Sequence, residues 1–165
     1  MVVGSDFALS GLANVKLLDT LVFVSAYLFG FRVGAAVGVL SETIWSVFSP
    51  YGFAGAIAPF LLAGELLFAL AGWTASKAWG SEFNLKSPYP LFIGSLLTVC
   101  AFVWDFETNA ATALLGFSPN SFWFAVFGPQ TLLFIIPHEI SDFLFGTLLA
   151  PAFIYIIPKT IRSES

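Results

Sequence analysis

Charged residues are scarce in this chain of 165 residues. Only 10% of them are Asp, Glu, Lys or Arg, whereas an ordinary soluble domain has about 25%. Hydrophobic residues make up 58% of the chain, and 18% of its residues are aromatic. A soluble protein of this length exposes more surface than so few charges can cover. The composition therefore excludes a soluble enzyme and predicts an integral membrane protein built almost entirely of helices.

Cysteine and histidine are nearly absent, which excludes several kinds of site. Cys100 is the single cysteine, so no intramolecular disulfide or cysteine-cluster metal site can form. His138 is the single histidine, so one chain cannot supply the paired histidines of a haem or zinc site. Phosphate-binding loops and Gly-x-Ser-x-Gly are also missing. We predict no resident metal, no cofactor and no catalytic residues, and any ATP-driven step requires another chain.

Basic residues are few as well. The six Lys and Arg are outnumbered by ten Asp and Glu, and the formal net charge is -4. A nucleic-acid partner is excluded because no basic patch is available to neutralise phosphates. The first 14 residues lack a basic start and a cleavage signature, so we expect no removable signal peptide. No charge run, low-complexity tract or repeat divides the chain, and residues 1–165 are predicted to form one transmembrane domain.

Six apolar segments are separated by polar residues, Pro or Gly. A helix needs about 20 residues to cross the hydrocarbon core of a bilayer. Three segments reach that length, whereas the other three are short and are expected to be tilted, interfacial or incomplete. Pro129 and Pro137 make a straight helix over the fifth segment improbable. The segments are residues 17–30, 33–48, 54–79, 90–115, 122–137 and 140–158.

The basic residues favour one orientation in the membrane. If all six segments crossed, the six basic residues would divide three against three, and neither side would be preferred as cytoplasmic. If residues 122–137 and 140–158 crossed only once together, Lys16 alone would lie opposite the other five. Those five are Arg32, Lys77, Lys86, Lys159 and Arg162. We therefore favour five crossings, with the N-terminus outside and the C-terminus in the cytoplasm.

Polar side chains within the apolar segments gather in the outer half of this arrangement. Ionisable residues inside a membrane are costly and mark functional sites. Aromatic walls with a few polar groups would suit a small polar ligand that carries hydrogen-bond donors or positive charge. Alternatively, the carboxylates face water and the aromatic residues form an interfacial belt. The candidate ligand contacts are Glu42, Trp45, Tyr51, Asp105, Asn109 and His138.

Three stretches in the first part of the chain form a recognisable pattern: DTLVFV at residues 19–24, YLFGFRVGAAVG at residues 27–38 and SETIWS at residues 41–46. They resemble the substrate-binding S components of energy-coupling factor (ECF) vitamin transporters. DFETN at residues 105–109 and HEISD at residues 138–142 look like the Asp-x-x-Thr-Asn and His-x-x-Ser-Asn stretches of some S components. Asp142 departs from the second pattern, because it stands where the pattern has Asn. The resemblance covers roughly residues 14–158.

The resemblance implies an all-α membrane bundle of five to six hydrophobic segments, without the helix that usually comes first in S components. It also implies a subunit of an ECF-type importer that crosses the cell membrane several times. Such a subunit captures a vitamin or vitamin precursor at the outer face. A transmembrane coupling subunit and two ATPase subunits would be its partners, beside the small-molecule substrate and the lipid bilayer.

Three other interpretations stay open. The chain could be a stand-alone secondary carrier or channel in which Glu65 and Asp105 form a proton path. It could be a membrane enzyme that uses His138 and Glu139, with Ser141 and Asp142 nearby. It could also be a purely structural subunit of a larger membrane complex.

Overall fold

The computed structural model describes residues 2–79, 83, 85, 88–116 and 121–163, and this part of the chain contains helices but no strand. The all-α fold predicted from composition is confirmed. Seven α-helices and one 3-10 turn follow one another within the described residues. They are α1 (Val2–Leu9), α2 (Leu18–Phe29), α3 (Phe31–Phe48), η1 (Gly55–Ile57), α4 (Ala58–Trp79), α5 (Tyr89–Leu114), α6 (Phe122–Phe127) and α7 (Pro129–Ser163).

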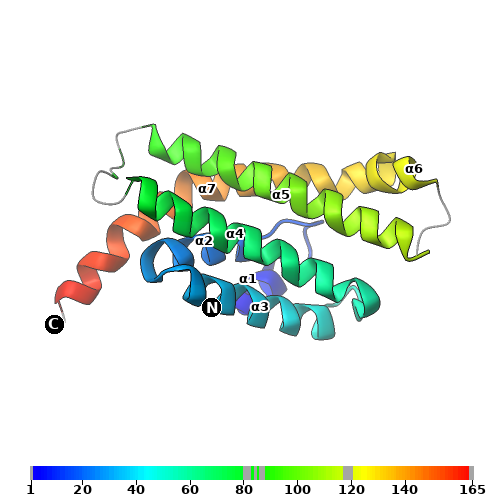
Figure 1. Cartoon of the computed structure of the whole chain (residues 1–165), viewed down its shortest axis with the longest axis horizontal. Coiled ribbons are helices and arrows are strands. Elements are labelled where there is room, and N and C mark those ends of the chain that lie inside the picture. Colours follow the sequence, from blue (N-terminus) through cyan, green and yellow to red (C-terminus); the bar gives the residue numbers. More distant parts are fainter. Residues whose placement is uncertain (1, 80–82, 84, 86–87, 117–120, 164–165) are drawn as a thin grey trace.

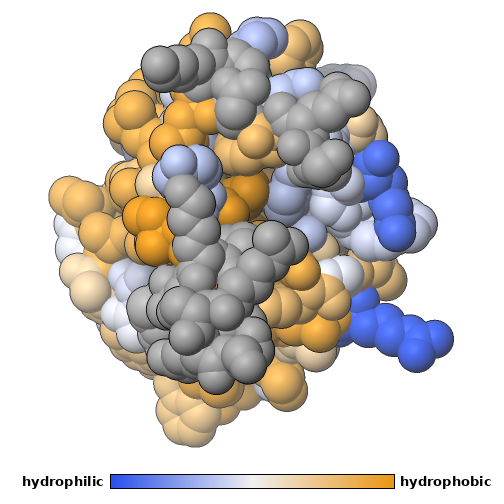
Figure 2. All heavy atoms as spheres, turned by 90° about the vertical axis from the view of Figure 1, so that its left-hand side faces the viewer, coloured by the Kyte–Doolittle hydropathy of each residue, from blue (hydrophilic) through white to orange (hydrophobic). Residues whose placement is uncertain are grey.

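Four stretches of helix in the described residues are long and apolar enough to cross a membrane. They are Phe31–Phe48, Gly55–Trp79, Tyr89–Leu114 and Pro129–Ile157. Many of their large apolar side chains are exposed, including Leu40, Val99 and Leu148. Figure 2 shows the end of the molecule that lies at the left in Figure 1, and hydrophobic residues lie around most of the edge of that view. The exposed apolar side chains of these helices suit contact with lipid better than contact with water. The helices therefore have the length and surface of membrane-spanning helices.

The helices lie side by side along the long axis of the molecule (Figure 1). α5 packs against α7 and α4, and α4 packs against α3. The shorter helix α2 contacts α3, α4 and α7, and most of its residues are buried. Figure 1 shows α6 at one end of the bundle, and the C-terminal turns of α7 at the other end. α2 is thus the centre of the bundle.

The last two apolar segments of the sequence do not form two separate helices. The chain breaks at Gly128, where α6 ends, and Pro129 begins α7 in the first helical turn, where proline is tolerated. The expectation that residues 122–137 are not a straight helix is confirmed at that break. α7 then continues through Pro137 to Ser163 as one helix. Residues 122–158 therefore supply one candidate span, and the described residues hold four, because α2 has only 12 residues.

Glycines allow α2 to approach its neighbours closely. A Cβ at Gly34 of α3 would collide with Ala26 of α2, and one at Gly72 of α4 would collide with the carbonyl of Phe23. Only a residue without a side chain fits at such contacts. The glycines at four-residue spacing in α3 thus serve packing within the chain.

Candidate functional site

His138 lies in the interior of the bundle, where it joins three helices. α7 carries this side chain, which has no exposed surface. Its Nδ1 is 2.9 Å from Oδ2 of Asp105 on α5, and its Nε2 is 2.7 Å from Oδ2 of Asp19 on α2. A neutral imidazole can donate one of these bonds, and an imidazolium can donate both. His138 therefore connects α2, α5 and α7 through polar contacts.

Two further carboxylates lie next to this group. Asp142 stands one turn after His138 on α7, with Oδ2 4.0 Å from Nε2 of His138. Glu65 of α4 is close enough to Asp19 for the two charges to interact. Both side chains are 0% exposed, and neither accepts a hydrogen bond of ordinary geometry from the described residues. We call Asp19, Glu65, Asp105, His138 and Asp142 the polar core.

A cavity of about 270 Å³ adjoins the polar core. Residues from α1 and the chain that follows it form one wall, and α3, α4, α5 and α7 supply the others. Its lining combines aromatic rings with groups of both charges. The lining residues are Asp6, Leu9, Ser10, Leu12, Asn14, Val15, Lys16, Glu42, Trp45, Tyr51, Leu61, Trp104 and Phe134. Its volume is near the lower end of ligand pockets, roughly 300–1,000 Å³.

A second hollow of about 440 Å³ lies beside this cavity. Trp45, Tyr51 and Leu61 line both, so these side chains stand between the two spaces. The ring centroids of Trp45 and Tyr51 are 6.1 Å apart, and Phe7 of α1 meets Trp45 edge-on at 5.2 Å. Aromatic side chains therefore form much of the boundary of the cavity.

Lys16 is the basic residue of the cavity. It is only 7% exposed, and its Nζ lies 3.6 Å from the ring centroid of Trp104, a cation–π contact. Burial by itself lowers the pKa of Lys16, but Glu42, Asp19, Glu65 and Asp6 together raise it more. The net shift is upward, so Lys16 carries its charge at physiological pH.

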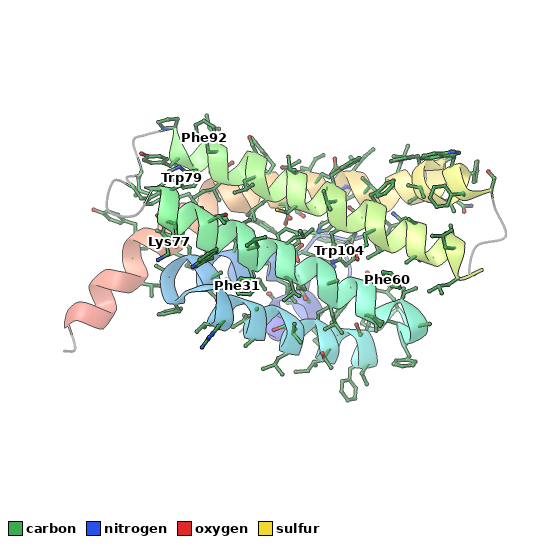
Figure 3. The ribbon with its side chains drawn as sticks, viewed as in Figure 1. Phe31, Phe60, Lys77, Trp79, Phe92 and Trp104 are labelled. Carbon is green, nitrogen blue, oxygen red and sulfur yellow. The ribbon has the colours of Figure 1, made fainter. Side chains whose placement is uncertain are left out.

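Trp104 connects the cavity to the polar core. Its Nε1 donates a hydrogen bond of 3.2 Å to the carbonyl of Leu61 on α4. Its ring meets the His138 ring edge-on, with centroids 5.3 Å apart. Figure 3 labels Trp104 in the interior of the bundle, where it projects from α5. A molecule bound in the cavity would thus touch a ring that also contacts His138.

The N-terminal segment closes over the cavity. Asn14 has a φ of 52°, a backbone conformation that asparagine adopts more readily than most residues. Its Nδ2 donates to the carbonyl of Phe134 at 3.2 Å and lies 3.4 Å from Oδ1 of Asp105. The Tyr51 hydroxyl donates a short hydrogen bond to the carbonyl of Ser10. Residues 10–17 are thereby held to α5, α7 and the chain after α3.

Asp6 is the acidic residue of α1 in this cavity. It is 5% exposed. Burial raises the pKa of Asp6 to about 7, against the opposing effect of the Lys16 charge. Asp6 therefore changes its protonation state near neutral pH.

Five of the six predicted ligand contacts lie at this cavity or next to it. Glu42, Trp45 and Tyr51 line it. Asp105 and His138 are in the adjoining polar core. Asn109 instead lines a separate hollow with Gln130, Thr131 and Phe134.

Sequence reasoning missed the N-terminal contributions of Asp6 and Asn14 and the burial of Lys16. Each stands in or beside a largely apolar stretch, which is the signal that identified the later acidic residues. It did not point to them because Asp6, Asn14 and Lys16 precede the first predicted apolar segment, residues 17–30.

The polar core can hold protons or a cation, and the cavity can accept a small molecule with groups of both charges. Ser141 is not arranged as a nucleophile, because its Oγ donates to the carbonyl of His138 and both ring nitrogens contact carboxylates. Protein-family models, curated proteins and solved structures yield no match to this chain. The resemblance to S components stays a prediction.

Proposed function

We propose that this chain is the substrate-binding subunit of an ECF-type importer and that it crosses the cell membrane several times. Its task is to capture a vitamin or vitamin precursor at the outer face. The observation that carries this proposal is the cavity lined by Lys16, Glu42, Trp45 and Tyr51. It lies by the last turns of α3 and the first turn of α4, away from the Lys77 end of α4. Aromatic area with a few fixed polar groups is the usual composition of a ligand pocket.

The positions of the basic residues support an outward-facing cavity. Arg32 follows the turn between α2 and α3, and Lys77 is in the last turn of α4. Figure 3 shows Lys77 at the end of α4 opposite Phe60. The last turns of α7, which include Lys159 and Arg162, share the Lys77 end (Figure 1), whereas Lys86 lies outside the described residues. Since basic residues favour the cytoplasmic side, the cavity end faces outward.

The charges of the cavity limit the kind of ligand. Lys16 can bind an anionic or acceptor group, and Glu42 can bind a donor or a cationic group. Ser46 Oγ lies 3.4 Å from Oε1 of Glu42, which leaves Oε2 without a partner among the described residues. A ligand with both a donor and an acceptor group would use both ends of this arrangement.

Release needs partner chains. A ligand shifts a conformational equilibrium only by its differential affinity for the two states, so binding alone does not move cargo inward. A transmembrane coupling subunit and two ATPase subunits would lower the affinity of the cavity. The exposed apolar surface of the bundle offers room for such contacts within the membrane.

Native mass spectrometry of the gently purified full chain tests this proposal. We expect a co-purified small molecule and the coupling and ATPase subunits. Glu42→Gln should lose the small molecule and keep the subunits, because it removes a cavity charge without changing size. Glu107→Gln is the matched control, since Glu107 lies outside the cavity lining. A wild-type chain that carries neither ligand nor partners would contradict the proposal.

The polar core favours one alternative, a secondary carrier with a proton path. Asp105, His138 and Asp19 are in direct contact, and Glu65 adjoins Asp19, so acidic groups follow one another through the interior. Uptake by vesicles that contain this chain and no ATPase would support the carrier and contradict the capture subunit.

A further inference from the structure

Buried carboxylates outnumber buried cations inside this bundle. Six acidic side chains are at most 5% exposed, whereas Lys16 and His138 are the buried basic groups of the described residues. Even with His138 protonated, six carboxylates against two cations leave an excess of four negative charges. Such an excess is not tolerated in a low-dielectric interior, so protons or bound cations must reduce it. The six are Asp6, Asp19, Glu42, Glu65, Asp105 and Asp142.

The surroundings of His138 resemble those of a metal-binding histidine. Such histidines donate one ring N–H to a carboxylate and present the other nitrogen to the metal. Here Asp105 faces Nδ1 at 2.9 Å, so Nε2 is the nitrogen left for a ligand. Two carboxylates, Asp19 and Asp142, lie on the Nε2 side at 2.7 Å and 4.0 Å.

The three potential ligand atoms are close enough to share one ion. One nitrogen of His138 and one oxygen each of Asp19 and Asp142 lie within 4.8 Å of one another. Ligands at about 2.0–2.2 Å from a tetrahedral metal ion are about 3.3–3.6 Å apart. The 2.7 Å pair of His138 and Asp19 would therefore open and Asp142 would move closer, with shifts of up to about 1 Å.

Asp142 supplies an independent observation. The side chain is 0% exposed, yet neither of its oxygens accepts a hydrogen bond within the described part of the chain. Buried carboxylates are normally hydrogen-bonded, and an exception needs an explanation. Because Oδ2 faces Nε2 of His138, a cation between them would satisfy Asp142.

We propose that Asp19, His138 and Asp142 bind one divalent first-row transition-metal ion, such as Zn²⁺ or Mn²⁺. Imidazole nitrogen combined with carboxylate oxygen suits these ions, whereas a site without nitrogen would suit Mg²⁺ or Ca²⁺. The metal takes the place of the proton between Nε2 of His138 and Asp19, and Asp105 orients the ring from Nδ1. The ion links α2 to α7. This site goes beyond ligand capture in the cavity and does not depend on it.

Metal retention by the purified full chain tests the site. The protein is prepared in detergent without a polyhistidine tag, stripped with a chelator, incubated with Zn²⁺ and separated from free ions. Elemental analysis should find one equivalent of Zn²⁺ bound to the wild type. Asp142→Asn, which keeps the size of the side chain, should weaken Zn²⁺ binding at least tenfold. Asp105→Asn should weaken it by roughly 10–100-fold, the usual effect of losing the carboxylate behind a metal-bound histidine.

Glu107→Gln is the matched control, because it removes a carboxylate of α5 outside the polar core and should retain the full equivalent. Co²⁺ gives a second readout on the wild type alone, since its visible spectrum reports nitrogen and oxygen ligation. This measurement decides the question even if a variant fails to fold. A wild type that retains no Zn²⁺ and shows no Co²⁺ spectrum overturns the site, and protons then neutralise the polar core. Equal retention by folded Asp142→Asn also overturns it.

Discussion

The two halves of α2 differ in burial and in what surrounds them, because all of residues 18–22 are buried but only three of residues 23–29 are. The first half presents Asp19 to the polar core, whereas the second presents the Phe23 carbonyl and Ala26 to glycines of α3 and α4. Close packing stabilises the second half. The first half instead carries charges whose burial is unfavourable unless each finds a partner. The first half of α2 therefore contributes less to stability than the second, and under the proposed function ligand binding would account for its retention.

The largest expected effect comes from breaking the polar half with His138→Leu. This change leaves Asp19 and Asp105 buried without the ring that bridges them. Removing one partner of a buried ion pair typically costs about 3–5 kcal/mol. Thermal unfolding in detergent should show a large decrease in the melting temperature. Adding Asp19→Asn and Asp105→Asn to this variant should restore much of the lost melting temperature, because both unpaired buried charges are then removed. An unchanged melting temperature for His138→Leu would show that the ring does not hold these carboxylates.

The apolar half is tested by Gly72→Ala. The new methyl group would collide with the Phe23 carbonyl, a backbone atom that cannot move aside alone. Overpacking of this kind costs about 1–3 kcal/mol. Gly4→Ala is the matched control, since a Cβ there meets nothing within 4 Å and alanine favours a helix. A Gly72→Ala protein as stable as the wild type would contradict the close contact between α2 and α4.

The helices of both halves were predictable from sequence, because runs of apolar residues give their length. The expected segment 90–115 became α5, Tyr89–Leu114, and segment 54–79 became η1 and α4. Glu42, Asp105 and His138 could also be found, since an ionisable residue within an apolar run is costly and therefore conspicuous. Their grouping depends on which turns of different helices face one another.

That grouping could not be read from the chain. His138 meets Asp105 at a sequence separation of 33 and Asp19 at a separation of 119. No local pattern fixes such contacts, because packing among several helices decides them. The position of Asn109 could not be predicted from the sequence either. It lies one turn beyond Asp105 on α5, yet it lines a different hollow. The sequence therefore identified most polar residues of the site but not their partners.

Trp104→Phe, at the place where the cavity meets the polar core, should have a smaller effect on stability. Phenylalanine keeps an aromatic ring but loses the 3.2 Å hydrogen bond from Nε1 to the Leu61 carbonyl. It also weakens the cation–π contact with Lys16, because indole binds cations better than benzene does. Together these losses should lower the free energy of unfolding by about 1–2 kcal/mol. Denaturation of the purified variant measures the change, and Trp73→Phe on the exposed face of α4 should leave stability within about 0.5 kcal/mol.

The smallest effect is local to α1 and depends on pH. The pKa of Asp6 is raised by burial to about 7, so the docked helix favours the protonated acid, whereas the detached helix ionises near the ordinary value of 3.8. The contribution of Asp6 to docking is therefore complete below about pH 4 and is lost as pH rises through about 7. Hydrogen exchange in α1 should accelerate more from pH 4 to pH 7 in the wild type than in Asp6→Asn, which removes the ionisation. Comparing the two proteins at each pH cancels the intrinsic pH dependence of exchange. Identical pH profiles would show that Asp6 stays ionised, and α1 would then be held mainly by contacts such as that between Phe7 and Trp45.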